Sequence, residues 1–431
     1  MRLEKLNDSI YLRRMIRVAT LLSSFCLFMA CKSMVKDELT ITELHIPVAR
    51  HIQTETPNWH LSPQDNLYLT WTSHLSDSLY GLNYSSLHND TFTRATIIST
   101  GTDWFVNWAD FPSIAVFPGS ELNLLAHFLQ KRPGDKTYDY DVKLALSRSG
   151  GDEWKVIDSL HDNAPAEHGF VSLVPFSYDK ILAMWLDGRA MISAEGDHND
   201  HDHGSGSMQL RSALVDIQGG VSQPQIIDDR VCECCQTDAT MTPKGPVLIY
   251  RNRSNDEERD IYITRLESGQ WSDPKPVCED HWKINGCPVN GPAIASINSQ
   301  LAVAWYTEAG GKPTIKLSFS NGPDLNFGPP LIIDTKNTPG RVSIAWIDKD
   351  RVAISLLDKD SKESPTTSIY LMIYSKEGHL ISRNMIAQTS ALRKSGFPVL
   401  TAHQGQLYLA YTSISQDNKT SIKAKKILMS Q

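Results

Sequence analysis

Residues 67–71, Leu-Tyr-Leu-Thr-Trp, form a short apolar run that ends on a large side chain. Six further runs of this kind follow, at intervals of about 50 to 65 residues. They occupy residues 124–128, 181–185, 247–250, 301–305, 352–356 and 407–411. A long, even period of short strands is typical of a β-propeller, in which each unit is one four-stranded blade. The sequence therefore predicts an all-β, seven-bladed propeller, with a six-bladed ring as the alternative.

The residues between these runs support the same period. Motifs that contain Gly or Pro open most units, and an alternating strand and a Gly-containing turn follow each run. The predicted units are 57–99, 110–160, 167–230, 235–278, 286–335, 338–388 and 395–430. The last unit shows only three clear strands. We expect the alternating segment 39–46 to supply the fourth strand and close the ring, because closure removes two exposed sheet edges.

The N-terminus has the features of a targeting segment. Three arginines precede an apolar stretch at 18–30, which has the length of a signal-peptide core and is short for a bilayer span. This stretch ends on Ala30 and Cys31, a pattern that resembles a bacterial lipobox. We expect a signal peptide over 1–31, lipidation of Cys31, a tether over 32–38 and one domain over 39–431. An ordinary signal peptide, an uncleaved anchor and a start at Met15 are the alternatives.

Composition limits the partners. The 431 residues carry a formal net charge of -7, and no basic run indicates nucleic-acid binding. We expect a monomer of the cell envelope that meets the membrane only through its lipid anchor. Its expected partner is a glycan or another small anionic ligand.

Cysteines and histidines form two candidate metal sites. Cys232, Cys234 and Cys235 place three thiols within four residues, a spacing that suits copper(I) or zinc. The alternative is disulfides that tie this cluster to Cys278 and Cys287, because an exported protein meets oxidising conditions. The second candidate lies in the hydrophilic insertion 194–207, where imidazoles alternate with acidic side chains, and a solvated loop is its alternative. Its ligands are His198, His201 and His203. No cofactor is certain from these patterns.

Polar residues concentrate in two kinds of loop that open at the same end of a propeller. Those that enter first strands include Asp110, Glu167, His168 and Asn290. Those that leave second strands, or lie near them, include Tyr138, Asp187, Arg189, Arg211, Tyr250, Arg251 and Arg259. Such a set suits an anionic or hydroxyl-rich ligand, because arginine forks bind carboxylates through two hydrogen bonds. For each residue alone, an ion pair between blades is the alternative.

The turn 147–154 fits the Asp-box pattern Ser-x-Asp-x-Gly-x-x-Trp, except that Ser149 replaces the Asp, and looser copies occur at 318–327 and 266–271. With these turns the exported part of the chain resembles the sialidase-related BNR-repeat propellers, and its Cys-x-Cys-Cys segment resembles an exported bacterial subset of them. The family's Arg-Ile-Pro motif is replaced by His45-Ile46-Pro47, and seven units exceed the family's six.

The resemblance implies a Tyr nucleophile with a Glu helper, an Asp acid and three arginines for a sugar carboxylate. The matching acids are Asp110 or Asp187, the helper is Glu167, and the nucleophile is Tyr250 or Tyr138. The arginines are Arg189, Arg251 and Arg259, with His168, Arg211 and Asn290 as further ligand contacts.

Three hypotheses follow. The first is an exported glycan-handling propeller, with glycoside hydrolysis as its expected reaction. It predicts that the acids, the tyrosine and the arginines share one cavity. The second is a non-catalytic propeller that binds a ligand or a metal, which predicts three or more sulfurs within coordination distance. The third is an interaction platform for another envelope protein, which predicts an exposed apolar face.

Overall fold

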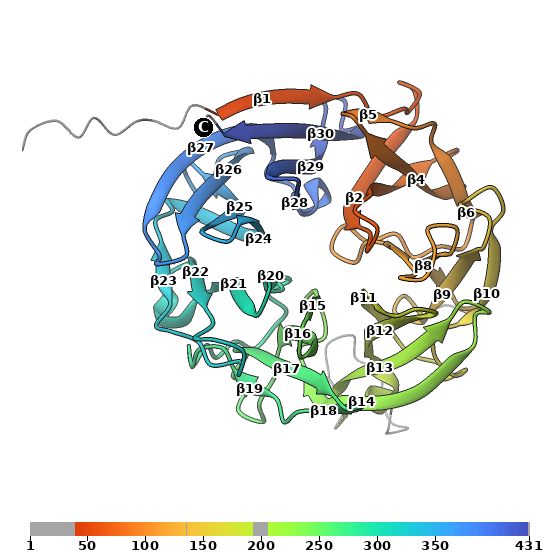
Figure 1. Ribbon diagram of the computed structural model, residues 1–431, viewed down its shortest axis with the longest axis horizontal. Coiled ribbons are helices and arrows are strands. Elements are labelled where there is room, and N and C mark those ends of the chain that lie inside the picture. Colours follow the sequence, from red (N-terminus) through yellow and green to blue (C-terminus); the bar gives the residue numbers. More distant parts are fainter. Residues whose placement is uncertain (1–38, 135, 193–205, 430–431) are drawn as a thin grey trace, which may run out of the picture. The chain divides into compact units, whose positions relative to one another are not determined.

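The computed structural model describes residues 39–134, 136–192 and 206–429. These residues form a ring of seven antiparallel sheets (Figure 1), so the predicted seven-bladed propeller is confirmed and the six-bladed alternative is wrong. Four predicted site residues lie outside the described residues: Cys31, His198, His201 and His203. Within the described ranges, no helix has the length and apolarity needed to cross a membrane.

The strands follow one another outward in each blade. The first blade contains β2 (Gln53–Leu61), β3 (Leu67–His74), β4 (Tyr80–His88), β5 (Thr91–Phe92) and β6 (Thr96–Gly101). The second contains β7 (Ile114–Val116), β8 (Leu124–Lys131), β9 (Tyr140–Ser147) and β10 (Lys155–Ser159). The third contains β11 (His168–Ser177), β12 (Lys180–Asp187), β13 (Met208–Asp216) and β14 (Val221–Val231).

The fourth blade contains β15 (Asp238–Thr242), β16 (Gly245–Arg251), β17 (Ile261–Glu267), β18 (Gln270–Trp271) and β19 (Lys275–Pro276). The fifth contains β20 (Ala293–Ile297), β21 (Gln300–Thr307), β22 (Thr314–Phe319) and β23 (Leu331–Ile333). The sixth contains β24 (Asn337–Asp348), β25 (Arg351–Lys359), β26 (Thr366–Ser375) and β27 (Leu380–Ser390). Short 3-10 helices, η1 (Gly188–Ile192), η2 (Ala309–Gly311) and η3 (Arg393–Ser395), lie in the connections.

The seventh blade joins the two ends of the ring. Its inner strands are β28 (Val399–His403), β29 (Gln406–Ile414) and β30 (Thr420–Met429), and its outermost strand is β1 (Leu39–Leu44). β1 pairs antiparallel with β30 from Leu39 opposite Met429 to Leu44 opposite Ala424. The segment expected to close the ring therefore does so, and Figure 1 shows these strands side by side.

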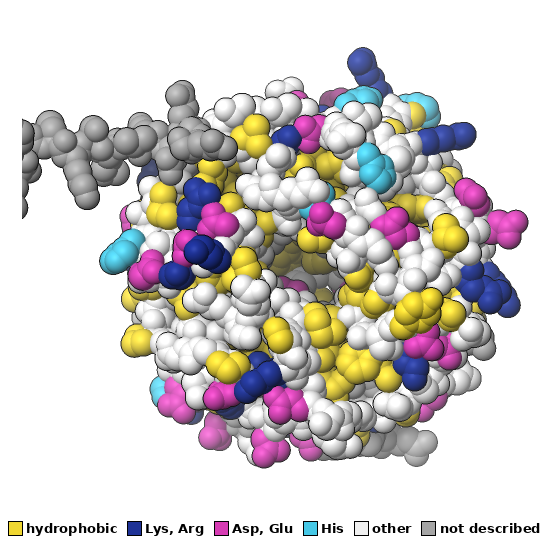
Figure 2. All heavy atoms as spheres, viewed as in Figure 1, with side chains coloured by type: hydrophobic (Ala, Val, Ile, Leu, Met, Phe, Trp, Pro, Cys, Tyr) yellow, Lys and Arg dark blue, Asp and Glu magenta, His cyan; other side chains and the backbone are white. Residues whose placement is uncertain are grey.

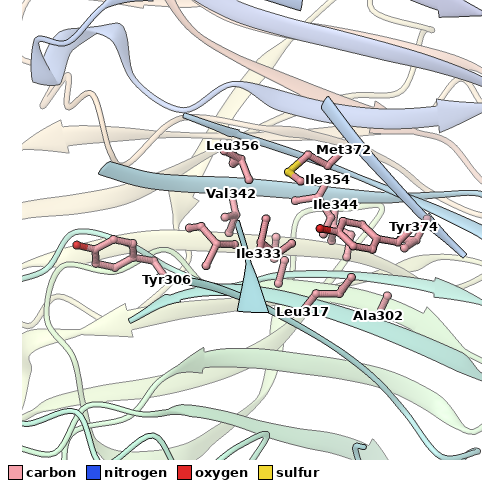
Figure 3. Packing of buried hydrophobic residues seen from close by; sticks show 14 of the residues in the cluster. Ala302, Tyr306, Leu317, Ile333, Val342, Ile344, Ile354, Leu356, Met372 and Tyr374 are labelled. Carbon is pink, nitrogen blue, oxygen red and sulfur yellow. The ribbon is translucent and has the colours of Figure 1, made fainter. Parts of the chain in front are cut away.

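The apolar runs of the sequence are the second strands of the blades. Each second strand is covered on both faces by neighbouring blades, so nearly all of its residues are buried, as in β3 and β21. Trp305 of β21 has no exposed surface. Figure 3 shows one such interface, where Ala302 and Leu317 of the fifth blade face Ile344 and Ile354 of the sixth. Full burial of one such aliphatic side chain contributes about 1.5–3 kcal/mol, which explains why both faces are apolar.

The first strands line a central channel. Figure 2 shows the ring hollowed at its centre, and a cavity of about 300 Å³ lies there among residues such as His60, Ile114, Val171 and Leu400. Because strands alternate in direction, the loops between second and third strands open at the same end as the loops that enter first strands. The turn 147–154 joins β9 to β10 and therefore lies at the other end, where Ser147 Oγ accepts a hydrogen bond from the Gly151 N–H (2.9 Å).

Candidate functional site

A cavity of about 610 Å³ opens among the loops of the ligand end, within the size range of small-molecule sites. Apart from Phe170, which lies in β11, every lining residue belongs to a loop that enters a first strand or leaves a second strand. These are the two kinds of loop that the sequence singled out. The lining is Asn107, Trp108, Ala109, Lys136, Tyr138, Asp139, Pro165, Ala166, Glu167, Phe170, Gly188, Met191, Glu233, Cys234, Cys287, Val289 and Arg393.

Glu167 is the predicted catalytic residue that lies in this cavity wall. Its backbone is fixed, because its carbonyl accepts a hydrogen bond from the Gly188 N–H (2.8 Å) and the residue bridges to Tyr140. The buried Tyr140 hydroxyl donates to Glu167 Oε1 (2.8 Å). Burial raises the pKa of Glu167 to about 7, and this exceeds the opposing effect of the Tyr140 hydrogen bond. Glu167 therefore exchanges a proton near neutral pH, as a general acid or base must.

Glu233 lines the same cavity in a contrasting environment. Arg253 Nη1 contacts Glu233 Oε1, and Arg259 Nη1 donates to Glu233 Oε2 (2.8 Å). Both guanidiniums also pair with Glu257, through Arg253 Nη2 (2.7 Å) and Arg259 Nη2 (2.9 Å). These three side chains, Glu233, Arg253 and Arg259, are less than a tenth exposed. Glu233 is thus paired with two guanidiniums through charge-assisted contacts.

The rest of the lining is apolar on one side and cationic on another. Trp108, Tyr138, Phe170, Met191 and Val289 supply the apolar surface. The ring of Trp108 stacks on Phe397 with an interplanar angle of 11°. Flat rings of this kind pack well against the C–H faces of a ligand, so the cavity offers both apolar contact and ionisable groups.

Arg341 and Arg393 make this region electropositive. The Arg341 guanidinium lies 4.7 Å from the centre of the Trp108 ring and donates to Ser395 Oγ and the Gly396 carbonyl. Burial, and then the Arg393 charge, lower the pKa of Arg341 to about 10. In the part of the chain that the structure describes, neither guanidinium forms an ion pair with a carboxylate. An anionic group in the cavity would therefore meet uncompensated positive charge.

Asp110 lies behind the cavity wall and does not line it. The residue is 4% exposed, and its Oδ2 accepts a hydrogen bond from the Phe170 N–H (2.9 Å). A Cβ on Gly169 would lie 2.1 Å from this oxygen, so the glycine permits the close approach. Burial raises the pKa of Asp110 to about 8. The predicted acid is thus a buried, mostly neutral carboxyl that positions the start of β11.

Asp187, His168 and Arg189 lie together in one cluster, in which Asp187 is the shared partner. Arg189 donates from Nε and Nη2 to the two oxygens of Asp187, at 2.7 and 2.8 Å. The Trp185 indole N–H also donates to Asp187, and His168 lies 3.6 Å away. Burial alone would raise the pKa of Asp187, but these partners lower it to about 2. Arg211 lies at the edge of this cluster, where its Nε donates to Gln209. These side chains therefore pair with one another within the third blade, whereas the alternative was an ion pair between blades.

Arg251 and Asn290 join the fourth blade to its neighbours. Arg251 is 2% exposed and donates to the backbone carbonyls of Asn290, Arg259 and Tyr306. The Asn290 side chain accepts from the Arg341 N–H and donates to the carbonyls of Pro288 and Pro339. Both residues therefore hold loops in place.

The two candidate nucleophiles lie in different surroundings. Tyr250 is 1% exposed, and its hydroxyl donates to Asp228 (2.5 Å), so it lies in the body of the ring and outside the cavity lining. Tyr138 lines the cavity and is 63% exposed. The four predicted catalytic residues are thus not brought together, and the tyrosine in contact with Glu167 is Tyr140.

The cysteine cluster borders the cavity. Sγ atoms of Cys232, Cys234 and Cys235 all lie within 4.8 Å of one another, and the thiol of Cys287 interacts with that of Cys234. Cys278 lies apart, beside Asp280. All five cysteines of the described part are free thiols, so none of the alternative disulfides is present there.

Sequence reasoning missed several residues of this site. Tyr140 stands within an alternating strand and carries no distinguishing pattern. Glu233 stands between the cysteines, which drew the interpretation toward metal. Trp108 and Arg393 precede first strands, and this position was the signal that could have identified them.

Comparisons with known proteins find distant structural likenesses only. No protein family and no curated protein matches the chain. The α-L-arabinofuranosidase Arb93A of Fusarium graminearum, solved with an iminosugar inhibitor, has a TM-score of 0.49 at 12% identity over 90% of this chain and 97% of that one. A Dyadobacter fermentans protein of unknown function has a TM-score of 0.49 at 10% identity, covering 91% of this chain and 99% of the other. A leech intramolecular trans-sialidase has 0.45 at 10%, covering 89% and 70%. Because these sequence identities and TM-scores are low, the comparisons carry no argument about activity, which has to be argued from the residues of this chain.

Proposed function

We propose that the cavity binds an acidic glycan and that the protein hydrolyses a glycosidic bond, with Glu167 as the proton donor. The observation that carries this proposal is a carboxyl with a pKa of about 7 in the wall of a 610 Å³ cavity, oriented by Tyr140. A proton donor to a glycosidic oxygen must hold its proton near neutral pH, and burial provides this. Trp108 and Phe170 supply apolar contact for the sugar, and Arg393 faces its acidic group.

The chemistry requires a second group that supports the positive charge developing at the sugar carbon. Glu233 is the acidic side chain that lines the same cavity while paired with Arg253 and Arg259. Glu167 has a raised pKa, whereas Glu233 contacts two guanidiniums, and two acids in such different environments suit the roles of proton donor and carboxylate partner. Water enters from the open end of the propeller.

The test is turnover of a panel of acidic and neutral aryl glycosides. We expect Glu167→Gln to lower kcat/KM by about 10²- to 10⁴-fold, the usual contribution of a general acid. Wild-type activity should fall as the pH rises through about 7, because Glu167 then loses its proton. The matched control is Glu308→Gln. It changes the acceptor of a second Tyr-to-Glu hydrogen bond, from Tyr306 (2.8 Å), from a carboxyl to an amide outside the cavity, and should leave activity unchanged.

Non-catalytic glycan binding is the second candidate, favoured by one observation. Both oxygens of Glu233 are already bonded to guanidiniums, which weakens it as a catalytic partner. This candidate predicts saturable binding of acidic glycans by the wild type and by Glu167→Gln alike, without turnover. If neither turnover nor binding occurs with any glycan, both functions are excluded.

We also propose, from the sequence alone, that the chain is exported and lipidated at Cys31. Cys31→Ser should release the protein from envelope membranes into the soluble fraction. Retention of this variant in the membrane fraction would contradict the anchor.

A further inference from the structure

Four thiols converge beside the cavity from two separate loops. Cys232, Cys234 and Cys235 lie between β14 and β15, and Cys287 lies between β19 and β20. Sγ of Cys232 is 3.4 Å from Sγ of Cys235, and no pair among the first three exceeds 4.8 Å. An ion bound tetrahedrally at a zinc–sulfur distance of about 2.3 Å needs sulfurs about 3.8 Å apart. The separation of this pair and the 4.8 Å limit for the first three sulfurs lie on either side of this value.

The backbone holds these ligands in place. The Cys232 N–H donates to the Arg251 carbonyl (3.0 Å), and Val231 bridges to Asn252. Cys232 and Cys235 are 1% and 2% exposed, so water is largely excluded from their sulfurs. Cys234 and Cys287 face the cavity. A metal ion here would add a second link between two loops that the hydrogen bond from the Gly291 N–H to Gln236 Oε1 (2.9 Å) already joins.

The charges around the sulfurs favour an anionic group there. Arg251, Arg253 and Arg259 are all less than a tenth exposed, while Glu233 and Glu257 are the carboxylates that pair with Arg253 and Arg259. Arg251 donates only to carbonyl oxygens and has no carboxylate partner among the described residues. A buried cation without an anion is costly. Thiolates around one zinc(II) or copper(I) ion carry a net negative charge, so a metal–thiolate group would supply the anion that Arg251 lacks.

One further contact couples the arginines to the sulfurs. Arg259 Nη1 lies 3.2 Å from Cys232 Sγ, so it can donate a hydrogen bond to a metal-bound thiolate. Hydrogen bonds of this kind orient metal ligands and tune their basicity.

A second cluster of ligand-type side chains does not have these properties. Asp141, His161 and His168 also lie within 4.8 Å of one another. However, His161 Nε2 accepts from the Val142 N–H (3.1 Å), and its Nδ1 donates to the Asp162 carbonyl (2.7 Å). Both nitrogens of His161 are therefore already used, and this cluster has no imidazole lone pair to offer from that residue.

We propose that Cys232, Cys234 and Cys235 bind one soft d¹⁰ metal ion, zinc(II) or copper(I), with Cys287 as the fourth ligand. The site forms part of the cavity wall and fixes the loop that carries Glu233. Thiolates prefer these two ions among the common biological metals, and the four sulfurs suit tetrahedral zinc or three-coordinate copper(I). The site requires reduced cysteines, so oxidation to disulfides would release the ion.

The experiment uses the untagged full-length chain, purified under reducing conditions and titrated separately with Zn²⁺ and with Cu⁺. We expect one equivalent of metal and an X-ray absorption spectrum with three to four sulfur neighbours at about 2.3 Å. Cys235→Ser should lower the affinity for the metal by more than about 100-fold. Loss of a residue that only hydrogen-bonds to a metal ligand already costs about 10- to 100-fold, and Cys235 is itself a ligand. Cys278→Ser, which removes the cysteine outside the cluster, should bind normally. The titration with the higher affinity identifies the metal.

Two outcomes overturn the proposal. One is a wild-type protein that binds no metal, whether its cysteines titrate as five free thiols or as disulfides. The other is metal with nitrogen and oxygen neighbours only, which Cys235→Ser keeps and which a His198→Ala, His201→Ala, His203→Ala variant loses. Because the absorption spectrum is measured on the wild type, the result does not depend on the folding of Cys235→Ser. Metal-dependent elevation of Tm in wild type and in Cys278→Ser provides a second readout.

Discussion

Glu167 and Glu233 line one cavity, but the walls that hold them have opposite electrical character. The wall between the second and third blades places Glu167 near Asp110 and Tyr140. Among the described residues no cation is bonded to either carboxyl, and burial raises the pKa of both acids. The wall between the third and fourth blades surrounds Glu233 with guanidiniums. A buried carboxyl without a cation holds its proton more strongly, whereas a guanidinium beside a carboxyl favours the charged form. The same residue type therefore stands in two opposite electrostatic environments.

The largest effect is expected for Asp110→Asn. The folded-state pKa of Asp110 is about 8, well above the ordinary aspartate value of 3.8. Between these two pH values the folded state keeps a proton that the unfolded state releases, so wild-type stability falls as pH rises. Each pKa unit corresponds to about 1.4 kcal/mol, and the full window to about 6 kcal/mol. The amide cannot ionise, so the variant should lack this loss.

The measurement is the free energy of unfolding by urea at pH 5, 6, 7, 8 and 9 for both proteins. The difference between them should shift in favour of Asp110→Asn up to about pH 8 and then level off. Asn keeps an oxygen for the Phe170 N–H, so no hydrogen bond is lost. Parallel curves across this range would show that Asp110 is ionised in the folded protein, and the contrast between the walls would disappear.

The next effect compares one substitution in the two walls. At pH 8, Glu233→Gln should destabilise the protein by about 3–5 kcal/mol, because Arg253 and Arg259 lose a charge partner in a buried place. Glu167→Gln should leave the free energy of unfolding unchanged or raise it, because it removes a carboxyl that ionises near pH 7 without a cation. Chemical denaturation at pH 8 measures both. Equal losses in the two variants would contradict the difference in environment.

The sequence predicted the ring because burial on both faces leaves a direct pattern. Each second strand, such as β3 or β21, is packed between blades, and this requires a continuous apolar run. The alternation in 39–46 likewise predicted the closing strand β1. The sequence also predicted which end of the propeller holds the cavity, because the alternating direction of the strands determines which loops lie together.

The roles of single loop residues were harder to predict, because they depend on neighbouring blades. Arg251 ends the second strand β16 and Arg189 closely follows the second strand β12, yet one donates to carbonyl oxygens and the other to a carboxylate. Nothing in the local sequence distinguishes these partners. The contact between Tyr140 and Glu167 spans 27 residues and two blades, so no local pattern reports it. The cysteine cluster was visible from its spacing, but Cys287 joins it only through the fold.

The smallest effect concerns two arginines of the cationic wall and rests on the proposed metal site. Arg253 and Arg259 both pair with Glu233 and Glu257, but only Arg259 also reaches a sulfur, Cys232 Sγ at 3.2 Å. Arg259→Gln should therefore weaken metal binding by about 10- to 100-fold, or about 1.4–2.7 kcal/mol. Arg253→Gln removes a similar charge without touching the sulfurs and should change affinity by less than about threefold. Competition with a chromophoric zinc chelator under reducing conditions measures both. Equal losses would show that the guanidiniums act on the site through their total charge, and the hydrogen bond from Arg259 to Cys232 would then have no separate role.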